Sequence, residues 1–345
     1  MKTVEQIVQQ SQQAKDLLGE NYQIFRLAGD ASSREYFRIL YGDHQTCTLM
    51  LMPEGAASMA EEYESTQRKI TTLPFVDVQN LLISKDVRVP EIYVDDTQNR
   101  ILLLEDLGDT QLIDVYQKNP EKYFLQSLQL LSKIANPKKT PPSIALERRF
   151  DFDLYVWEFD HYIEYGIQKI IEYKESEIVK IKEQFHNISH TYTTWDTQLT
   201  HRDYHSKNLM ILDDQTQATI DFQDALLGPV YYDLASLLKD AYTKIDRSLQ
   251  EKLVFAYQQM LDPALPDASL SKDEFLFRFD LMSLHRNLKA AGRFVYIDQV
   301  KNNPNYLKDV PQALSYAIDT VSLHHSLRHL QVVLKPYMLK LIEEV

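Results

Sequence analysis

Glycine is scarce in this sequence of 345 residues. The eight glycines stand at positions 19, 29, 42, 55, 108, 166, 228 and 292. Three common fingerprints each need two glycines within about five residues: the dinucleotide-binding GxGxxG, the P-loop GxxxxGK[ST] and the hydrolase elbow GxSxG. Since no two of these glycines are that close, the sequence excludes all three.

Cysteine, long apolar runs and net positive charge are also lacking. Cys47 is the single cysteine, so we predict no internal disulfide, a reducing compartment, and a small apolar role for this side chain in a strand. No apolar run approaches about 18 residues and no signal-peptide core is visible, so we predict no membrane segment and a cytoplasmic location. The 37 basic and 50 acidic residues give a net charge of −13, which argues against binding to duplex nucleic acid.

Hydrophobic patterns divide the chain into a strand-rich first part and a helical second part. From residue 107 onward helical patterns prevail. The first part is predicted to contain a helix at 1–19, strands at 22–28, 34–40 and 46–52, a helix from Ser58 to Ile70, a further helical stretch, and strands at 89–96 and 100–106. We therefore predict an α+β, two-lobed fold with an N-lobe at 1–106 and a C-lobe at 107–345.

The most unusual segment is THRDYHSKNLMILDDQTQATIDFQD, residues 200–224, which places carboxylates within and beside short apolar runs. A buried carboxylate needs a partner or a cation. Two apolar runs predict a β-hairpin centred near Gln215, so its open end would bring Asn208 and Asp221 together. An amide oxygen and a carboxylate are suitable ligands for a hard divalent cation.

Asp203 precedes Asn208 by five residues, in the loop that enters this hairpin. Protein kinases share the pattern HRDxxxxN followed by a further Asp. Their first Asp accepts the proton of the substrate hydroxyl, and the Asn and second Asp hold metal ions on the nucleotide phosphates. We therefore predict Asp203 as the catalytic base and Asn208 and Asp221 as the metal ligands.

The same segment, continued as IDFQDALLGPVYYDLASLLKDAY, resembles the aminoglycoside phosphotransferase superfamily, whose small-molecule kinases have the protein-kinase fold. GDASSREYFR, LLLEDLGD and LHRNLKAAGRF with NYLKDVP are similar to a narrower group, the bacterial anomeric kinases of N-acetylmuramate and N-acetylglucosamine. These enzymes phosphorylate the C1 hydroxyl of the sugar in cell-wall recycling. The resemblance implies a protein-kinase-like fold, ATP and Mg²⁺ as cofactors, and a small-molecule sugar as substrate.

The resemblance also implies roles for further residues. The hinge between the lobes would be Leu102–Leu107, with the backbone of Glu105 and Leu107 meeting adenine. His205 would face the transferred phosphate, and Asp233 would brace the catalytic loop, a structural role. Backbone N–H groups and two hydroxyls would cover the phosphates, in the loop of Gly29, Asp30, Ala31, Ser32 and Ser33.

One expected residue is missing. Protein kinases carry a lysine on the third strand that binds the α- and β-phosphates, but positions 16–68 contain no lysine. Arg34 or Arg38 could take its place, and each could equally be a surface charge. The gap leaves a catalytically silent nucleotide-binding regulator as one alternative to an active sugar kinase. A second alternative is another small-alcohol kinase, of the aminoglycoside, choline or homoserine type.

The acceptor site is less defined by sequence. The aromatic side chains of a predicted helix at 150–166, Trp157 among them, could stack on a sugar or could face the core. N-acetylmuramate carries a lactyl carboxylate, which requires local positive charge. Arg286, Lys289 and Arg293 lie at helical spacing and are the candidates, with ordinary solvated charges as the other interpretation. The oligomeric state is left open.

Overall fold

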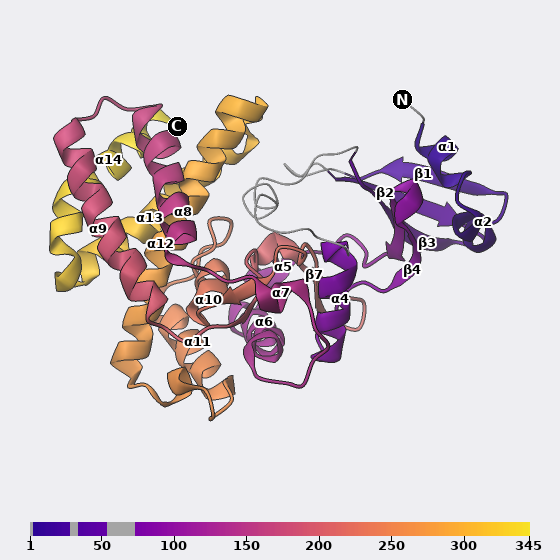
Figure 1. Ribbon diagram of the computed structural model, residues 1–345, viewed down its shortest axis with the longest axis horizontal. Coiled ribbons are helices and arrows are strands. Elements are labelled where there is room, and N and C mark those ends of the chain that lie inside the picture. Colours follow the sequence, from indigo (N-terminus) through magenta and orange to yellow (C-terminus); the bar gives the residue numbers. More distant parts are fainter. Residues whose placement is uncertain (1–2, 28–33, 54–72) are drawn as a thin grey trace.

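The computed structural model describes residues 3–27, 34–53 and 73–345. A small sheet-rich part and a larger helical part lie side by side (Figure 1). The phosphate loop predicted at Gly29–Ser33 and the helix predicted at Ser58–Ile70 lie outside the described residues. Within the described ranges, no helix is both long enough and apolar enough to cross a membrane.

The smaller part is built on an antiparallel sheet with the strand order β1-β2-β3-β5-β4. The strands lie close to their predicted positions and are β1 (Tyr22–Arg26), β2 (Glu35–Tyr41), β3 (Gln45–Leu51), β4 (Ile92–Asp96) and β5 (Ile101–Glu105). Cys47 of β3 is fully buried among apolar side chains of β2, β5 and the N-terminal helices. This is the small apolar role expected for it.

The N-terminal helical stretch is two helices and not the single one predicted. They are α1 (Val4–Val8) and α2 (Gln12–Leu18). Ser11 starts the second helix, because its hydroxyl accepts a hydrogen bond from the Ala14 N–H at 3.2 Å. An N-cap of this kind gives the chain a new helix start inside a continuous amphipathic pattern.

Helix α4 (Pro74–Ser84) precedes β4 in sequence but packs with the core of the larger part. The ring of Phe75 lies 4.8 Å from that of Phe222, centroid to centroid. The apolar core of the larger part thus reaches across the predicted lobe boundary. The division at residue 107 stays a prediction.

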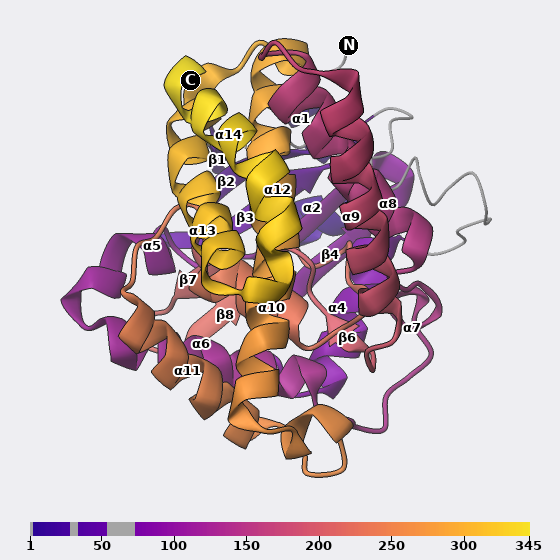
Figure 2. The same cartoon turned by 90° about the vertical axis from the view of Figure 1, so that its left-hand side faces the viewer.

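The larger part is mainly helical. Figure 2 shows α8, α9, α12, α13 and α14 packed as neighbours. Its helices are α5 (Leu112–Val115), α6 (Pro120–Ala135), α7 (Ile144–Glu147), α8 (Phe152–Tyr162), α9 (Glu175–Thr193), α10 (Tyr231–Leu238), α11 (Arg247–Met260), α12 (Lys272–Lys301), α13 (Val310–Leu323) and α14 (Arg328–Glu344). Two small antiparallel sheets pair β6 (Gln198–Thr200) with β9 (Leu226–Gly228), and β7 (Leu209–Ile211) with β8 (Gln217–Thr219).

The contact between α8 and α12 depends on a glycine and lies where α8 becomes a wide helical turn. Helix α8 continues as the π-helical turn η3 (Ile163–Gln168), where a single helix was expected. A Cβ atom on Gly292 of α12 would lie 2.8 Å from the Cα of Tyr162. Because no larger residue allows this approach, Gly292 brings α12 against α8 where the π-helical turn begins.

Candidate active site

The hairpin predicted at the centre of the HRD segment is present as β7 and β8. Leu209 pairs with Thr219, which centres the turn on Asp214, one residue before the predicted Gln215. The Asn208 carbonyl accepts a hydrogen bond from the Ile220 N–H at 3.0 Å. Asp221 is the next residue, so Asn208 and Asp221 stand at the same end of the hairpin, as predicted from sequence.

The loop that carries Asp203 is held from two sides. Asp233, in the first turn of α10, accepts hydrogen bonds from the backbone N–H groups of His201 at 2.5 Å and Arg202 at 2.9 Å. Arg202 has a φ of 78°, a conformation that costs a non-glycine residue about 1–3 kcal/mol. On the other side, the amide Nδ2 of Asn208 donates to the Asp203 carbonyl at 2.9 Å. These bonds stabilise the strained loop in one shape.

Asp203 is an ionised and accessible carboxylate. Its side chain is 35% exposed, and its Oδ1 lies 3.9 Å from the Arg286 guanidinium. Burial acts to raise the pKa of Asp203, but the positive charges of Lys289 and Arg286 outweigh it and hold this pKa below its usual range. Such a group is well suited to accept a hydrogen bond from a hydroxyl and to orient it.

Asp221 is in the opposite electrostatic state. Burial, followed by the negative charge of Asp203, raises the pKa of Asp221 to about 6, and a 2.9 Å hydrogen bond from Gln223 only partly opposes this. Additional positive charge nearby would stabilise the ionised form of this carboxylate, and a divalent cation would supply it. Asp221 and the oxygen of Asn208 therefore fit two positions around Mg²⁺. In the described part of the chain no cluster of three or more His, Cys, Asp and Glu side chains could hold a metal, so further positions would be left to phosphate and water oxygens.

His205 lies beside Asn208. Its Nε2 is 3.3 Å from the Asn208 amide nitrogen, which makes the ring nitrogen the acceptor. Burial lowers the pKa of His205, so the ring is neutral near pH 7. With both amide hydrogens of Asn208 directed to Asp203 and His205, its Oδ1 is the atom left to meet a cation. That His205 faces the transferred phosphate stays a prediction.

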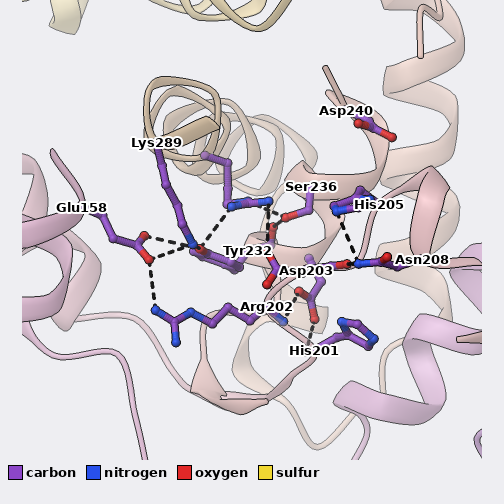
Figure 3. A network of polar contacts seen from close by, with 12 residues as sticks. Glu158, His201, Arg202, Asp203, His205, Asn208, Tyr232, Ser236, Asp240 and Lys289 are labelled. Atoms are coloured by element: carbon purple, nitrogen blue, oxygen red, sulfur yellow. Dashed lines mark hydrogen bonds and ion pairs between the residues drawn. The ribbon is translucent and has the colours of Figure 1, made fainter. Parts of the chain in front are cut away.

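Behind Asp203 lies a buried charge network that sequence reasoning missed (Figure 3). Its centre is the buried Glu158 of α8, whose carboxylate lies 2.8 Å from Lys289 Nζ, 3.3 Å from His285 Nε2 and 3.4 Å from Arg202 Nη2. Burial alone would raise the pKa of Glu158, but the charges around it, Lys289 first, lower it to about 2. The only sequence signal was an acid four residues after Leu154, on the apolar face of a helix.

The four predicted acceptor residues fall into two groups. Arg286 and Lys289 lie next to Asp203: Arg286 Nε donates to the Ser236 hydroxyl at 2.6 Å, and Lys289 Nζ donates to the Tyr232 hydroxyl at 2.8 Å. Trp157 and Arg293 stand outside this network. The Trp157 ring stacks on His161 at 5.7 Å between centroids, and the Arg293 guanidinium lies 4.8 Å from the centroid of the Tyr296 ring.

The two arginines proposed to replace the strand-three lysine have different surroundings. Arg38 of β2 forms ion pairs with Asp106 at 2.6 Å and Asp109 at 2.9 Å, so it joins the sheet to the chain that leaves it. Arg34 instead acts on Asp221, whose pKa its positive charge helps to lower. Arg34 is therefore the better candidate for contact with phosphate, and this role stays a prediction.

The hinge predicted at Leu102–Leu107 begins inside the sheet. Residues 102–105 still belong to strand β5, and the Glu105 N–H donates to the Glu91 carbonyl at 2.8 Å. The connection that leaves the sheet is Asp106–Gly108. Within the described residues the Leu107 N–H makes no backbone hydrogen bond, so it can serve as the predicted donor to adenine. The Glu105 side chain forms an ion pair with Arg88.

Comparison with known proteins settles the family. Residues 24–268 match the model of the phosphotransferase enzyme family. The chain belongs to this family. A Pseudomonas aeruginosa protein named N-acetylmuramate/N-acetylglucosamine kinase is 30% identical over 307 residues, which cover 88% of this chain and 85% of that protein. A protein of the same name from Neisseria meningitidis is 25% identical over 295 residues, covering 84% and 83%.

Solved phosphotransferase structures confirm the predicted two-lobed, protein-kinase-like fold. Choline kinase from Streptococcus pneumoniae superposes with a TM-score of 0.59 at 14% identity, covering 91% of this chain and 98% of that chain. A choline/ethanolamine kinase family protein from Mesorhizobium loti gives a TM-score of 0.61 at 12% identity, covering 98% and 99%. At these identities the likeness establishes the fold alone.

Proposed function

We propose that this phosphotransferase transfers the γ-phosphoryl group of ATP to the anomeric hydroxyl of N-acetylmuramate or N-acetylglucosamine. The observation that carries the proposal is the pairing of an ionised, accessible Asp203 with Asn208 and Asp221 at one end of a hairpin. The relatives that cover most of the chain are named for these two sugars, which supports the choice of acceptor.

Asp203 would accept a hydrogen bond from the C1 hydroxyl and direct its lone pair at the phosphorus. Because Lys289 and Arg286 hold the pKa of Asp203 low, the carboxylate is a weak base, and the proton would pass to it only as the new O–P bond forms. Its main contribution is then orientation of the nucleophile.

Asn208 and Asp221 would hold Mg²⁺, which neutralises negative charge on the phosphates when it is bound. Asp233 keeps the loop in place through the two backbone bonds to His201 and Arg202. The Leu107 N–H would meet adenine. The loop predicted over the phosphates lies outside the described residues, and its role remains part of this proposal.

A choline-type acceptor fits less well beside the catalytic loop. Lys207 Nζ lies 3.5 Å from the centroid of the Tyr242 ring and 5.6 Å from that of Tyr306. Quaternary ammonium groups are recognised by faces of this kind. Since the chain's own ammonium already occupies this aromatic surface, we favour an uncharged or anionic acceptor.

The proposal is tested with ATP, Mg²⁺ and a panel of acceptors: the two amino sugars, their methyl glycosides, choline, homoserine and an aminoglycoside. We expect transfer to the free sugars alone, with the methyl glycosides binding as inhibitors because their C1 oxygen is blocked. Phosphorylation of a methyl glycoside would show that another hydroxyl reacts. Tight nucleotide binding without transfer to any acceptor would favour the silent regulator.

A further inference from the structure

A second group of ring side chains lies on the same two helices as the Glu158 network. We call Trp157, His161, Tyr165 and Tyr296 the aromatic row. The ring centroids are 5.7 Å apart for Trp157 and His161, 4.8 Å for His161 and Tyr165, and 5.0 Å for Tyr165 and Tyr296. All four side chains remain partly exposed, so the row is not a closed part of the core.

The local backbone explains how the row forms. Trp157, His161 and Tyr165 are four residues apart, and an α-helix with 3.6 residues per turn rotates such positions steadily away from one line. The π-helical turn η3 has a wider turn and keeps Tyr165 beside His161. Gly292 brings α12 close enough for Tyr296, one turn later, to reach both rings.

Arg293 adds a desolvated positive charge to the row, with its guanidinium over the Tyr296 ring. Burial lowers the pKa of Arg293, whereas the buried Arg202 and Arg286 have raised pKa values because acidic groups surround them. A guanidinium in this state gains more from an anionic ligand than one already balanced by carboxylates.

His161 supplies an unused polar atom at the centre of the row. Its Nε2 is buried and makes no hydrogen bond within the described residues. Burial and then the charge of Arg293 lower the pKa of His161 to about 4, so the ring is neutral near pH 7. A neutral ring nitrogen of this kind can exchange a hydrogen bond with a hydroxyl or amide of a ligand.

The row lies within reach of the reacting group. Arg286, beside Asp203, and Arg293 are seven residues apart on α12, roughly 11 Å along the helix axis. Asp203 also acts electrostatically on Arg293. A pyranose with its reacting hydroxyl at Asp203 and an extended acidic substituent can bridge this distance.

We propose that the aromatic row is the surface on which the acceptor sugar stacks, and that Arg293 binds a carboxylate carried by that sugar. Lys289 and Arg286 belong instead to the network that keeps Asp203 ionised. This inference rests on the proposed function, and it selects the anionic amino sugar, N-acetylmuramate, as the preferred acceptor.

The charge contact is tested by measuring KM for both sugars in Arg293→Gln. We expect KM for N-acetylmuramate to rise about 10- to 100-fold, the range for one charge-assisted hydrogen bond, and KM for N-acetylglucosamine to change less than about 3-fold. Lys340→Gln, which removes an exposed charge from α14, is the matched control and should leave both values unchanged. An equal rise in KM for the two sugars would contradict the proposed contact between Arg293 and the carboxylate.

The wild-type enzyme offers a second test that needs no altered protein. The methyl ester of N-acetylmuramate lacks the negative charge, so its KM should exceed that of the free acid about 10-fold or more. In Arg293→Gln this difference should vanish, because the partner is gone. Equal KM values for acid and ester in the wild type would refute the inference even if Arg293→Gln failed to fold.

The stacking surface is tested with Trp157→Ala against Trp157→Phe. The first should raise KM for both sugars roughly 5- to 10-fold with kcat nearly unchanged, and the second should retain most of the affinity because it keeps a ring. Unchanged KM in Trp157→Ala would remove Trp157 from the acceptor site. A wild-type enzyme that phosphorylates neither sugar would instead refute the proposed function.

Discussion

Asp203 and Asp221 are two carboxylates of one site whose surroundings shift their pKa values in opposite directions. Nearby cations keep the pKa of Asp203 low, while burial and the charge of Asp203 raise the pKa of Asp221 to about 6. Different environments of this kind commonly separate the roles of paired acids. Here the low pKa of Asp203 suits it to orient a hydroxyl, and the raised pKa of Asp221 suits it to bind a cation.

Asp203→Asn should lower kcat at least about 100-fold, because the amide cannot accept a proton and orients the hydroxyl poorly. KM for ATP should stay within about 2-fold of the wild-type value, since Asp203 is not among the proposed metal ligands. Steady-state kinetics with saturating sugar measure both constants. Asp214→Asn, in the exposed hairpin turn, is the control. Near-native turnover in Asp203→Asn would rule out this residue as the base.

Glu158→Gln should destabilise the protein by roughly 3–5 kcal/mol, because it leaves Lys289 and Arg202 buried without their counter-charge. The pKa of Glu158 is lowered from 4.5 to about 2, so its ionised form stabilises the fold above about pH 4.5. That contribution is lost as the pH falls toward 2. Urea unfolding from pH 7 to pH 3 measures both effects.

In that experiment the stability gap between wild type and Glu158→Gln should narrow below about pH 4.5. The exposed Glu164→Gln on the π-helical turn serves as the control and should show little gap at any pH. A gap that stayed constant down to pH 3 would mean that the charge of Glu158 is not what stabilises the network.

Among the elements, those with a local pattern were predictable. The five strands of the sheet and the β7–β8 hairpin follow from short apolar runs between turn residues, and the spacing from Asp203 to Asn208 is itself local. The start of α2 at Ser11 was missed because it depends on one hydroxyl. The π-helical turn was also missed; it begins where Gly292 of α12 approaches Tyr162, a contact between residues distant in sequence. Glu158 was missed for the same reason: its partner Lys289 is 131 residues away.

The substitution Gly292→Ala should stabilise α12 through helix propensity and destabilise its packing against α8. Alanine should favour the helix by about 1 kcal/mol, but its Cβ would meet the Cα of Tyr162 at 2.8 Å. We expect the clash to prevail, with a net loss of roughly 1–3 kcal/mol in the free energy of unfolding. Urea unfolding measures the sign, and Ala290→Gly on the same helix calibrates the propensity effect. A stabilised Gly292→Ala would show that the two helices can move apart freely.

At the scale of the whole molecule, the sheet and the helical part are joined by Asp106–Gly108 and by the ion pairs of Arg38. Leu107→Pro removes the N–H proposed to meet adenine. We expect KM for ATP to rise roughly 3- to 10-fold, the effect of one net hydrogen bond, with kcat at saturating ATP little changed. Leu107→Ala, which keeps the N–H, should behave like the wild type. A folded Leu107→Pro with native KM would place adenine elsewhere.

The single cysteine can be used to measure how often the sheet opens. Cys47 is fully buried in β3, and burial raises the pKa of its thiol to about 12. An exposed thiolate is the nucleophile that attacks a disulfide reagent. At neutral pH the labelling rate should therefore measure how often the sheet opens. ATP with Mg²⁺ should slow the labelling if the nucleotide rests against the sheet. Because Cys47 is the single cysteine, this experiment on the unmodified chain measures the opening of the sheet and gives no signal from the helical part.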